Sequence, residues 1–186
     1  MRLIKRLLFQ HFYSGRFGEK PQLVVIHIAQ GTREQVSATF RNEEKSSHYL
    51  VNTDGSIWQF VKEEDTSWAQ GKVLNPKSEI VKAYKKNPNP ICISVEHEGT
   101  DNINEVQYVA SAELIKDICS RWGIPLDRTH IIGHREIRND KSCPAGISIE
   151  RLIELAQKEP EIEVKRDLLT RLLALYQRLL EILKSG

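Results

Sequence analysis

The chain has 186 residues, of which 40% are hydrophobic, and it carries 27 basic against 25 acidic side chains. This length allows one well-buried core, so we expect one domain with an appendage. A formal net charge of +2 provides no basic field of the kind that binds nucleic acid, and we expect no such partner. Three cysteines, an odd number, do not make a disulfide framework and suit a reducing compartment.

The N-terminal segment has an apolar run without the features of a secretory signal. Lys5 and Arg6 interrupt the run, which stops at Gln10, whereas a signal needs about 7–15 uninterrupted apolar residues and a cleavage site. We therefore expect a protein that is cytoplasmic when made. Residues 1–19 are predicted to form an N-terminal arm. No segment approaches the ~20 apolar residues that span a bilayer.

The first predicted elements of the domain are a buried strand and a helix. Residues 22–28 form a continuous apolar run rich in β-branched side chains, which is typical of a strand buried on both faces. Thr32 with Gln35 three residues later is a capping-box pattern, which predicts a helix over residues 33–41.

A hairpin follows, and then a long connection. Residues 49–51 and 57–61 are strand-like, and Asp54-Gly55 between them is a favoured hairpin turn. Prolines punctuate residues 70–90, which predicts an irregular connection there.

The second half of the domain contains two strands around a long helix. Residues 91–96 and 129–133 are short apolar strands, and residues 104–122 carry apolar side chains at helical spacing. Gly123 stands where a C-terminal helix cap belongs. Strands separated by helices predict an α/β fold, and the hairpin makes a single mixed β-sheet flanked by helices the expected architecture.

Pro160 marks the predicted end of the main domain, which we assign to residues 20–159. Residues 160–186 carry leucines on a broad helical stripe and predict a C-terminal amphipathic helix that must bury its apolar face. Its charges are balanced, whereas a membrane-seeking helix usually has a strongly basic face. The helix could pair with copies of itself, fold back on the domain or contact a membrane, and of these we favour a homo-oligomer formed through residues 161–186.

Polar side chains at the ends of apolar strands are the strongest functional signal. His27 and His134 each follow a buried run, and Cys143 lies nine residues after His134. Two imidazoles and a thiolate are what an open catalytic zinc site requires, and zinc can make water nucleophilic near neutral pH. Glu96 ends another apolar strand, where it could take a proton from such a water. Taken singly, each histidine also fits a core residue and Glu96 a solvated carboxylate.

Five segments, in this order, complete the pattern: LVVIH (23–27), SSHYLVNTDGSIWQFVKEEDTSW (46–68), ICISVEHEG (91–99), IIGHREI (131–137) and KSCP (141–144). With them, residues 20–155 resemble the zinc N-acetylmuramoyl-L-alanine amidases related to phage endolysins and peptidoglycan recognition proteins. The resemblance implies hydrolysis of the amide bond between N-acetylmuramic acid and L-alanine in bacterial peptidoglycan. It is consistent with a bacteriolytic enzyme of a phage or prophage that degrades the cell wall, and equally with an intracellular enzyme of wall recycling.

The resemblance also implies a role for each candidate residue. His27, His134 and Cys143 correspond to the ligands of a Zn²⁺ ion, the only cofactor implied. Glu96 corresponds to the catalytic glutamate, and Lys141 to the lysine that stabilises the oxyanion. One departure concerns the segment TAWHAG of many relatives, which reads TSWAQG here, with Ala69 in place of the histidine.

Three alternatives stay open at this point. A non-catalytic peptidoglycan-binding module is disfavoured because such relatives typically lack the cysteine that is present here as Cys143. A metal-free thiol hydrolase would use Cys143 with His134, and we expect Lys141 to lower the pKa of the thiol. A structural zinc site usually has four ligands, and only three are apparent.

The remaining histidines and cysteines have structural interpretations. His48 and His130 flank strands and are predicted to be structural. His97 should point to the face of its strand opposite to Glu96. Cys92 and Cys119 lie on a strand and on an apolar helix stripe, and both are expected in the core.

Overall fold

The structure, a computed structural model, describes residues 4–7 and 11–158. The strands are β1 (Ile4–Arg6), β2 (Phe12–Tyr13), β3 (Leu23–Ile26), β4 (Tyr49–Val51), β5 (Ile57–Gln59), β6 (Thr66–Ser67), β7 (Cys92–His97) and β8 (Ile131–Gly133). The helices are α1 (Arg33–Asn42), α2 (Glu79–Tyr84), α3 (Glu105–Trp122) and α4 (Ile149–Gln157), with short 3₁₀ turns at Asn89–Ile91 and His134–Glu136. The predictions for residues 160–186, an amphipathic helix and self-association, lie outside the described residues. Within the described part, no helix is both long and apolar enough to cross a membrane.

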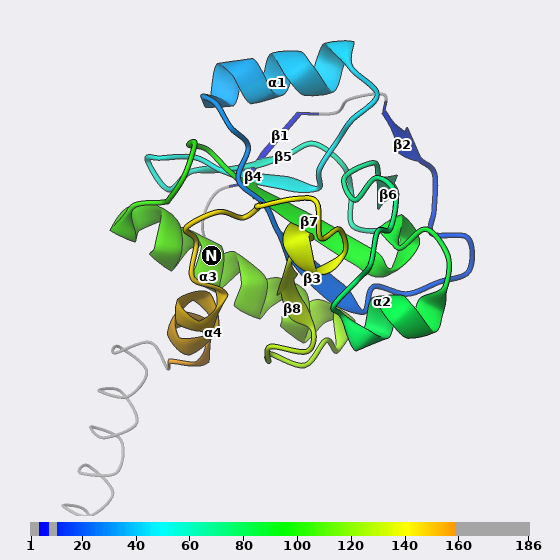
Figure 1. The fold of residues 1–186 in the computed structure, drawn as a ribbon. Helices are drawn as coiled ribbons and strands as arrows, with labels where there is room; N and C mark the ends of the chain where they lie inside the picture. The colour runs from blue at the N-terminus through cyan, green and yellow to red at the C-terminus, as the bar shows by residue number, and fades with distance from the viewer. Residues whose placement is uncertain (1–3, 8–10, 159–186) are drawn as a thin grey trace, which may run out of the picture. The chain divides into compact units, whose positions relative to one another are not determined.

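A mixed six-stranded sheet forms the centre of the domain, with strand order β1-β5-β4-β7-β3-β8 (Figure 1). β3 pairs in parallel with β7 on one side and β8 on the other. The antiparallel pair β4 and β5 is the predicted hairpin, and β4 pairs in parallel with β7. The expected α/β class with one mixed sheet flanked by helices is therefore confirmed.

The two longest helices begin at the capping signals in the sequence. Before α1, the Thr32 side chain accepts a hydrogen bond from the Gln35 N–H, and the Gln35 side chain accepts one from Thr32 N–H. Asn104 and Gln107 form the same reciprocal pair before α3. Gly123 ends α3 in the left-handed conformation, with φ of 67°. Each cap satisfies backbone groups that a helix end leaves without partners.

The connection over residues 70–90 is more ordered than the sequence predicts, because it contains α2. Ser78 caps this helix by accepting a hydrogen bond from the Val81 N–H. Val81 is buried against Leu23 and Ile132 of the sheet. A helix of six residues carries little periodicity of its own, and tertiary burial of one side chain stabilises it.

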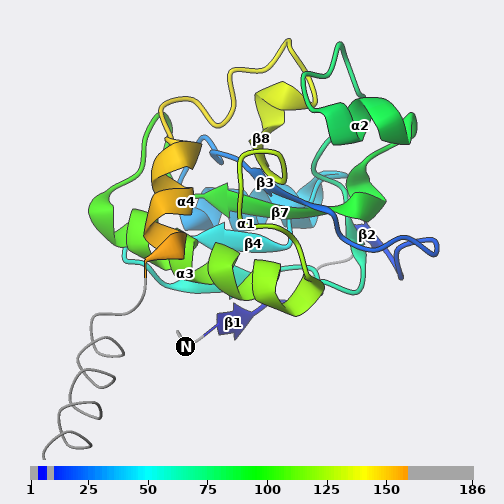
Figure 2. The same ribbon diagram turned by 90° about the horizontal axis from the view of Figure 1, so that it is seen from below.

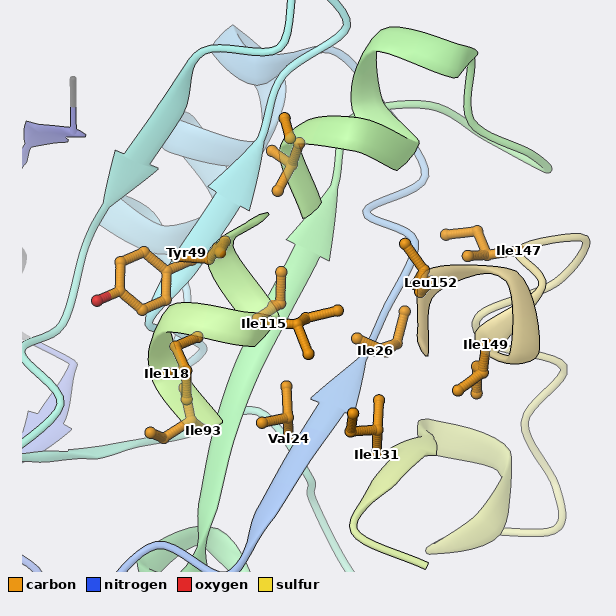
Figure 3. Packing of buried hydrophobic residues seen from close by; sticks show 14 of the residues in the cluster. Val24, Ile26, Tyr49, Ile93, Ile115, Ile118, Ile131, Ile147, Ile149 and Leu152 are labelled. Carbon is orange, nitrogen blue, oxygen red and sulfur yellow. The ribbon is translucent and has the colours of Figure 1, made fainter. Parts of the chain in front are cut away.

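One face of the sheet packs against α3 and α4 and holds the largest core (Figures 2 and 3). Labelled members of this core in Figure 3 are Val24, Ile26, Tyr49, Ile93, Ile115, Ile118, Ile131, Ile147, Ile149 and Leu152. The predicted core residue Cys119 belongs to it. Val24, Ile26 and Ile93 point to this face because side chains alternate along a strand.

The opposite face carries two smaller apolar clusters, separated by polar side chains. Val36 and Phe40 of α1 pack with Leu50 at one end of this face. Val81 of α2 packs with Cys92, the other predicted core cysteine, at the other end. Along β7 this face therefore changes from apolar Cys92 to polar Ser94 and Glu96, and the polar strip is where a site can form.

The described parts of the N-terminal arm, residues 4–7 and 11–19, belong to the domain. β1 joins the edge of the sheet in parallel with β5, and β2 pairs with β6. Arg16, only 6% exposed, donates hydrogen bonds to the carbonyl oxygens of Glu63 (2.6 Å), Pro90 (2.7 Å) and Cys92 (3.1 Å). Arg16 therefore links the arm to the loop after β5 and to the start of β7.

Replacing this buried cation is expected to destabilise the fold. Arg16→Met keeps the apolar stem but leaves three carbonyl oxygens without their donor, and each orphaned buried group costs about 1–3 kcal/mol. We expect the free energy of unfolding to fall by at least about 2 kcal/mol in urea titrations. Arg6→Met, on the exposed side of β1, is the control and should stay within about 0.5 kcal/mol of the parent. Equal effects of the two changes would contradict this role of Arg16.

Candidate metal centre

Three neighbouring parallel strands bring the predicted site residues together. Ile26 of β3 lies in register with Val95 of β7 and with Gly133 of β8. His27 and His134 directly follow β3 and β8, so both leave the sheet at the same edge. Glu96 follows Val95 within β7 and lies at the same level.

Cys143 reaches this edge from the loop between β8 and α4. The main-chain N–H of Ile28 donates a hydrogen bond to its sulfur at 3.3 Å. The Sγ atom lies 3.8 Å from Nδ1 of His27, and the rings of His27 and His134 are 4.6 Å apart between centroids. One donor atom from each of the three residues falls within 4.8 Å of the others. Two imidazoles and a thiolate at this separation fit a single zinc ion.

Burial keeps both histidines in the form that binds metals. The pKa of His27 is held well below its usual value, first by burial and then by neighbouring His134. The pKa of His134 is also lowered, chiefly by burial. Neutral imidazoles have a lone pair to offer an ion, so neither ring must lose a proton near neutral pH before binding.

The pKa of the Cys143 thiol is raised, whereas the sequence predicted that Lys141 would lower it. Burial, followed by the charge of Glu96, raises the pKa of Cys143 to about 12. Lys141 does act to lower it, but with less effect than burial. A thiol of this kind is a poor nucleophile by itself, whereas a bound cation deprotonates a ligating thiol. The chemistry therefore favours a metal ligand over a thiol hydrolase.

Glu96 lies beside the cluster and is largely withdrawn from water. Its Oε1 atom is 3.8 Å from Nδ1 of His27, and its side chain is 14% exposed. Burial raises the pKa of the Glu96 carboxyl to about 8. Its Oε2 atom is buried with no hydrogen-bond partner among the described residues. A carboxyl with these properties can take up and release a proton near neutral pH.

Lys141 is exposed on the loop that leads to Cys143. Its main-chain N–H donates a hydrogen bond to the Arg138 carbonyl at 3.2 Å. Its positive charge acts to lower the pKa of both His134 and Cys143. The sequence-predicted lysine is thus near enough to influence the cluster electrostatically.

His97 supports the cluster from the other face of the sheet. Its Nδ1–H donates to the His27 carbonyl at 2.9 Å, and its Nε2 contacts the Ser111 hydroxyl of α3 at 2.8 Å. This orientation, opposite to Glu96, agrees with the alternation expected for a strand. His48 is fully buried and contacts Arg16, and His130 contacts Asp127, in keeping with structural roles.

Two features near the site have no clear signal in the sequence. Gln70 contacts His134 through its main-chain carbonyl, although it lies in the predicted irregular connection. A pocket of about 190 Å³ borders Glu96 and is lined in part by Gln30, Gln35 and Thr39. These polar side chains come from α1 and the turn before it, and only the packing of α1 on the sheet brings them to Glu96.

Gly133 allows the segments that carry His134 and Cys143 to approach each other. A Cβ atom at this position would lie 2.6 Å from Cδ of Pro144, the residue after Cys143, and 3.3 Å from Ile149. Gly133→Ala is therefore expected to displace Cys143, to destabilise the fold by about 1–3 kcal/mol and to weaken zinc binding. Urea unfolding and a chelator competition assay would measure both effects. Parent-like values in both assays would contradict this close packing.

Comparison with known proteins adds independent evidence. A family model described as N-acetylmuramoyl-L-alanine amidase matches residues 17–146, more than half of the chain. The N-acetylmuramoyl-L-alanine amidase AmiD of Escherichia coli (strain K12) is 29% identical over an alignment of 141 residues that covers 67% of this chain and 49% of AmiD. The chain thus spans about half the length of this curated relative.

Solved structures show the same fold. AmpD has a TM-score of 0.65 at 21% identity, covering 83% of this chain and 94% of AmpD. The N-acetylmuramoyl-L-alanine amidase LysC from Clostridium intestinale URNW has a TM-score of 0.63 at 13% identity, covering 86% and 100%. AmiD from E. coli, in complex with the substrate anhydro-N-acetylmuramic acid-L-Ala-D-γ-Glu-L-Lys, has 0.58 at 23%, covering 74% and 59%. With the family match over residues 17–146, this chain belongs to the N-acetylmuramoyl-L-alanine amidase family.

Proposed function

We propose that the protein is a zinc-dependent hydrolase of the amide bond between N-acetylmuramic acid and L-alanine in bacterial peptidoglycan. The observation that carries this proposal is the convergence of His27, His134 and Cys143 within 4.8 Å, beside the carboxyl of Glu96. Family membership and the substrate bound by AmiD support the same bond as the target.

His27, His134 and Cys143 would hold the zinc ion. Three protein ligands are typical of catalytic zinc sites, which keep a further position for water or substrate. When bound, zinc lowers the pKa of water and polarises the carbonyl under attack. The protein contributes a set of donors whose imidazoles are already neutral.

Glu96 would act as the proton carrier of the reaction. Its carboxylate accepts a proton from the attacking water and then returns it to the amine of L-alanine as the C–N bond breaks. A general acid–base is most effective when its pKa lies near the working pH, and burial raises that of Glu96 to about 8.

Lys141 and the pocket beside Glu96 would act on the substrate. The Lys141 ammonium donates a hydrogen bond to the carbonyl oxygen as negative charge develops on it. Gln30, Gln35 and Thr39 line the pocket and offer hydrogen-bonding groups to the sugar or the peptide. These contacts would orient the scissile amide toward Glu96.

We also propose a biological role as a phage or prophage lysis enzyme that is cytoplasmic when made and acts on the cell wall. The five sequence segments similar to phage endolysins support this role. Expression in a bacterial host should cause lysis only when a second protein opens the inner membrane. Lysis of equal extent without such a protein would contradict the proposal that the enzyme is cytoplasmic when made.

Digestion of purified peptidoglycan by the full chain, followed by mass spectrometry, tests the activity. We expect free stem peptides with an L-alanine amino terminus, and glycan strands whose muramic acid keeps a free carboxyl group. Binding to the wall by the zinc-loaded protein without these products would favour the peptidoglycan-binding module instead.

A further inference from the structure

Gln70 lies in the loop between β6 and α2, directly behind the metal centre. The residue is completely buried. Its main-chain N–H donates to Oδ1 of Asn89 at 3.0 Å, and its side-chain Nε2 donates to the Ser94 hydroxyl at 2.8 Å. Both ends of Gln70 are therefore held in place by neighbours that belong to, or directly precede, β7.

The main-chain carbonyl of Gln70 determines how the His134 ring is protonated. Nε2 of His134 lies 3.0 Å from this oxygen. A carbonyl oxygen can only accept a hydrogen bond, so Nε2 carries the proton and Nδ1 keeps its lone pair. The contact thus leaves Nδ1 of His134 as the atom available to an ion.

The His27 ring has the same requirement. Its Nδ1 atom faces the other donors, 3.8 Å from both Cys143 Sγ and Glu96 Oε1. Its Nε2 atom is buried and has no hydrogen-bond partner within residues 4–7 and 11–158. If Nδ1 binds an ion, Nε2 must carry a proton and needs an acceptor.

The Gln70 side chain supplies a matching acceptor. Its Oε1 atom is also buried without a partner in the described part of the chain. The main chain of Gln70 lies against the His134 ring, whose centroid is 4.6 Å from that of the His27 ring, so the two unpaired atoms belong to the same buried region. Because Nε2 of Gln70 is engaged by Ser94, Oε1 is the end of the carboxamide that is free to accept from His27.

We propose that Gln70 is the positioning residue for both histidines of the metal centre. Its main-chain carbonyl accepts a hydrogen bond from His134, and its side-chain carbonyl accepts one from His27. Each imidazole then presents Nδ1 to the ion. This inference rests on the proposed zinc site but concerns residues outside the ligand set, and zinc affinity tests it without any measurement of hydrolysis.

Two substitutions separate hydrogen bonding from packing. Gln70→Met keeps a side chain of similar length and the main-chain carbonyl, but removes the acceptor for His27. We expect it to weaken zinc binding about 10–100-fold, the usual effect of removing such a partner. Gln70→Glu restores an acceptor, and the Ser94 hydroxyl can turn to donate to it, so its zinc affinity should return to that of the parent.

The experiment is a chelator competition assay for zinc on the full chain, with far-UV circular dichroism and thermal unfolding of the metal-free proteins. Gln59→Met is the matched control, because Gln59 lies on β5 and its Nε2 donates to the Tyr49 hydroxyl at 3.2 Å. Nitrogen NMR of the imidazoles adds a direct readout. The Nε2–H of His27 should lose its protection from exchange in zinc-loaded Gln70→Met, while that of His134 keeps it.

The outcomes are distinct. Weakened zinc binding in Gln70→Met and recovery in Gln70→Glu, with parent-like folding of both, would support the inference. Zinc affinity of Gln70→Met equal to that of Gln59→Met, or equal weakening by the Met and Glu variants, would overturn it. If Gln70→Met does not fold, Gln70→Glu and the NMR signal of His27 in the parent decide. A parent that binds no zinc would instead refute the proposed function.

Discussion

Removal of zinc is expected to lower the rate of stem-peptide release by about 100-fold or more, and added zinc should restore it. The reason is that the thiol of Cys143, the alternative nucleophile considered above, cannot take over the attack. Without a cation the pKa of the Cys143 thiol lies at about 12, so the thiol stays protonated at neutral pH. Treatment with dipicolinate, dialysis and titration with zinc, with products measured by mass spectrometry, would test this.

The substitution that corresponds to zinc removal is Cys143→Ser, which replaces the sulfur of a proposed ligand with a hydroxyl that rarely binds zinc. We expect loss of both zinc binding and hydrolysis. Cys119→Ser is the control, since Cys119 is a buried core residue of α3 outside the set of candidate ligands. Hydrolysis that resists the chelator but is abolished by thiol alkylation would contradict the zinc mechanism and establish the thiol alternative.

Glu96→Gln is expected to lower kcat by about 10²–10⁴-fold while leaving zinc affinity close to that of the parent. The amide keeps the size of the carboxyl but cannot accept the proton of the attacking water, and loss of a general base typically costs this much. Steady-state kinetics and chelator competition measure the two quantities separately. Glu105→Gln, an exposed position at the start of α3, should change neither.

The zinc affinity of Glu96→Gln decides between two roles for this carboxyl. Glu96 Oε1 lies as close to His27 Nδ1 as Cys143 Sγ does, at 3.8 Å. A large drop in affinity would make Glu96 a fourth ligand and exclude it as the proton carrier. Unchanged kcat together with unchanged zinc affinity would exclude both roles.

Sequence reasoning succeeded where a short pattern has a local physical cause. Thr32 with Gln35 predicted the start of α1, because the reciprocal hydrogen bonds involve only neighbouring residues. His27 and His134 were chosen because each ends a buried strand, and parallel strands end at one edge of a sheet. The role of Glu96 was inferred from its strand end and from resemblance to a family, that of Lys141 from the resemblance alone, and both stay predictions.

The sequence by itself therefore determined the fold class, the main elements and the set of side chains that meet at the sheet edge. Only the tertiary structure revealed helix α2, whose stability depends on the burial of Val81. The same is true of the pairing of β1 with β5. The tertiary structure also reversed the expected direction for the pKa of Cys143, because burial outweighs the nearby charge of Lys141. The contacts of Gln70 also depend on the tertiary structure, since they join it to His134 and Ser94, which are distant in the chain. Desolvation and long-range hydrogen bonds depend on which segments pack together, and no local pattern records that.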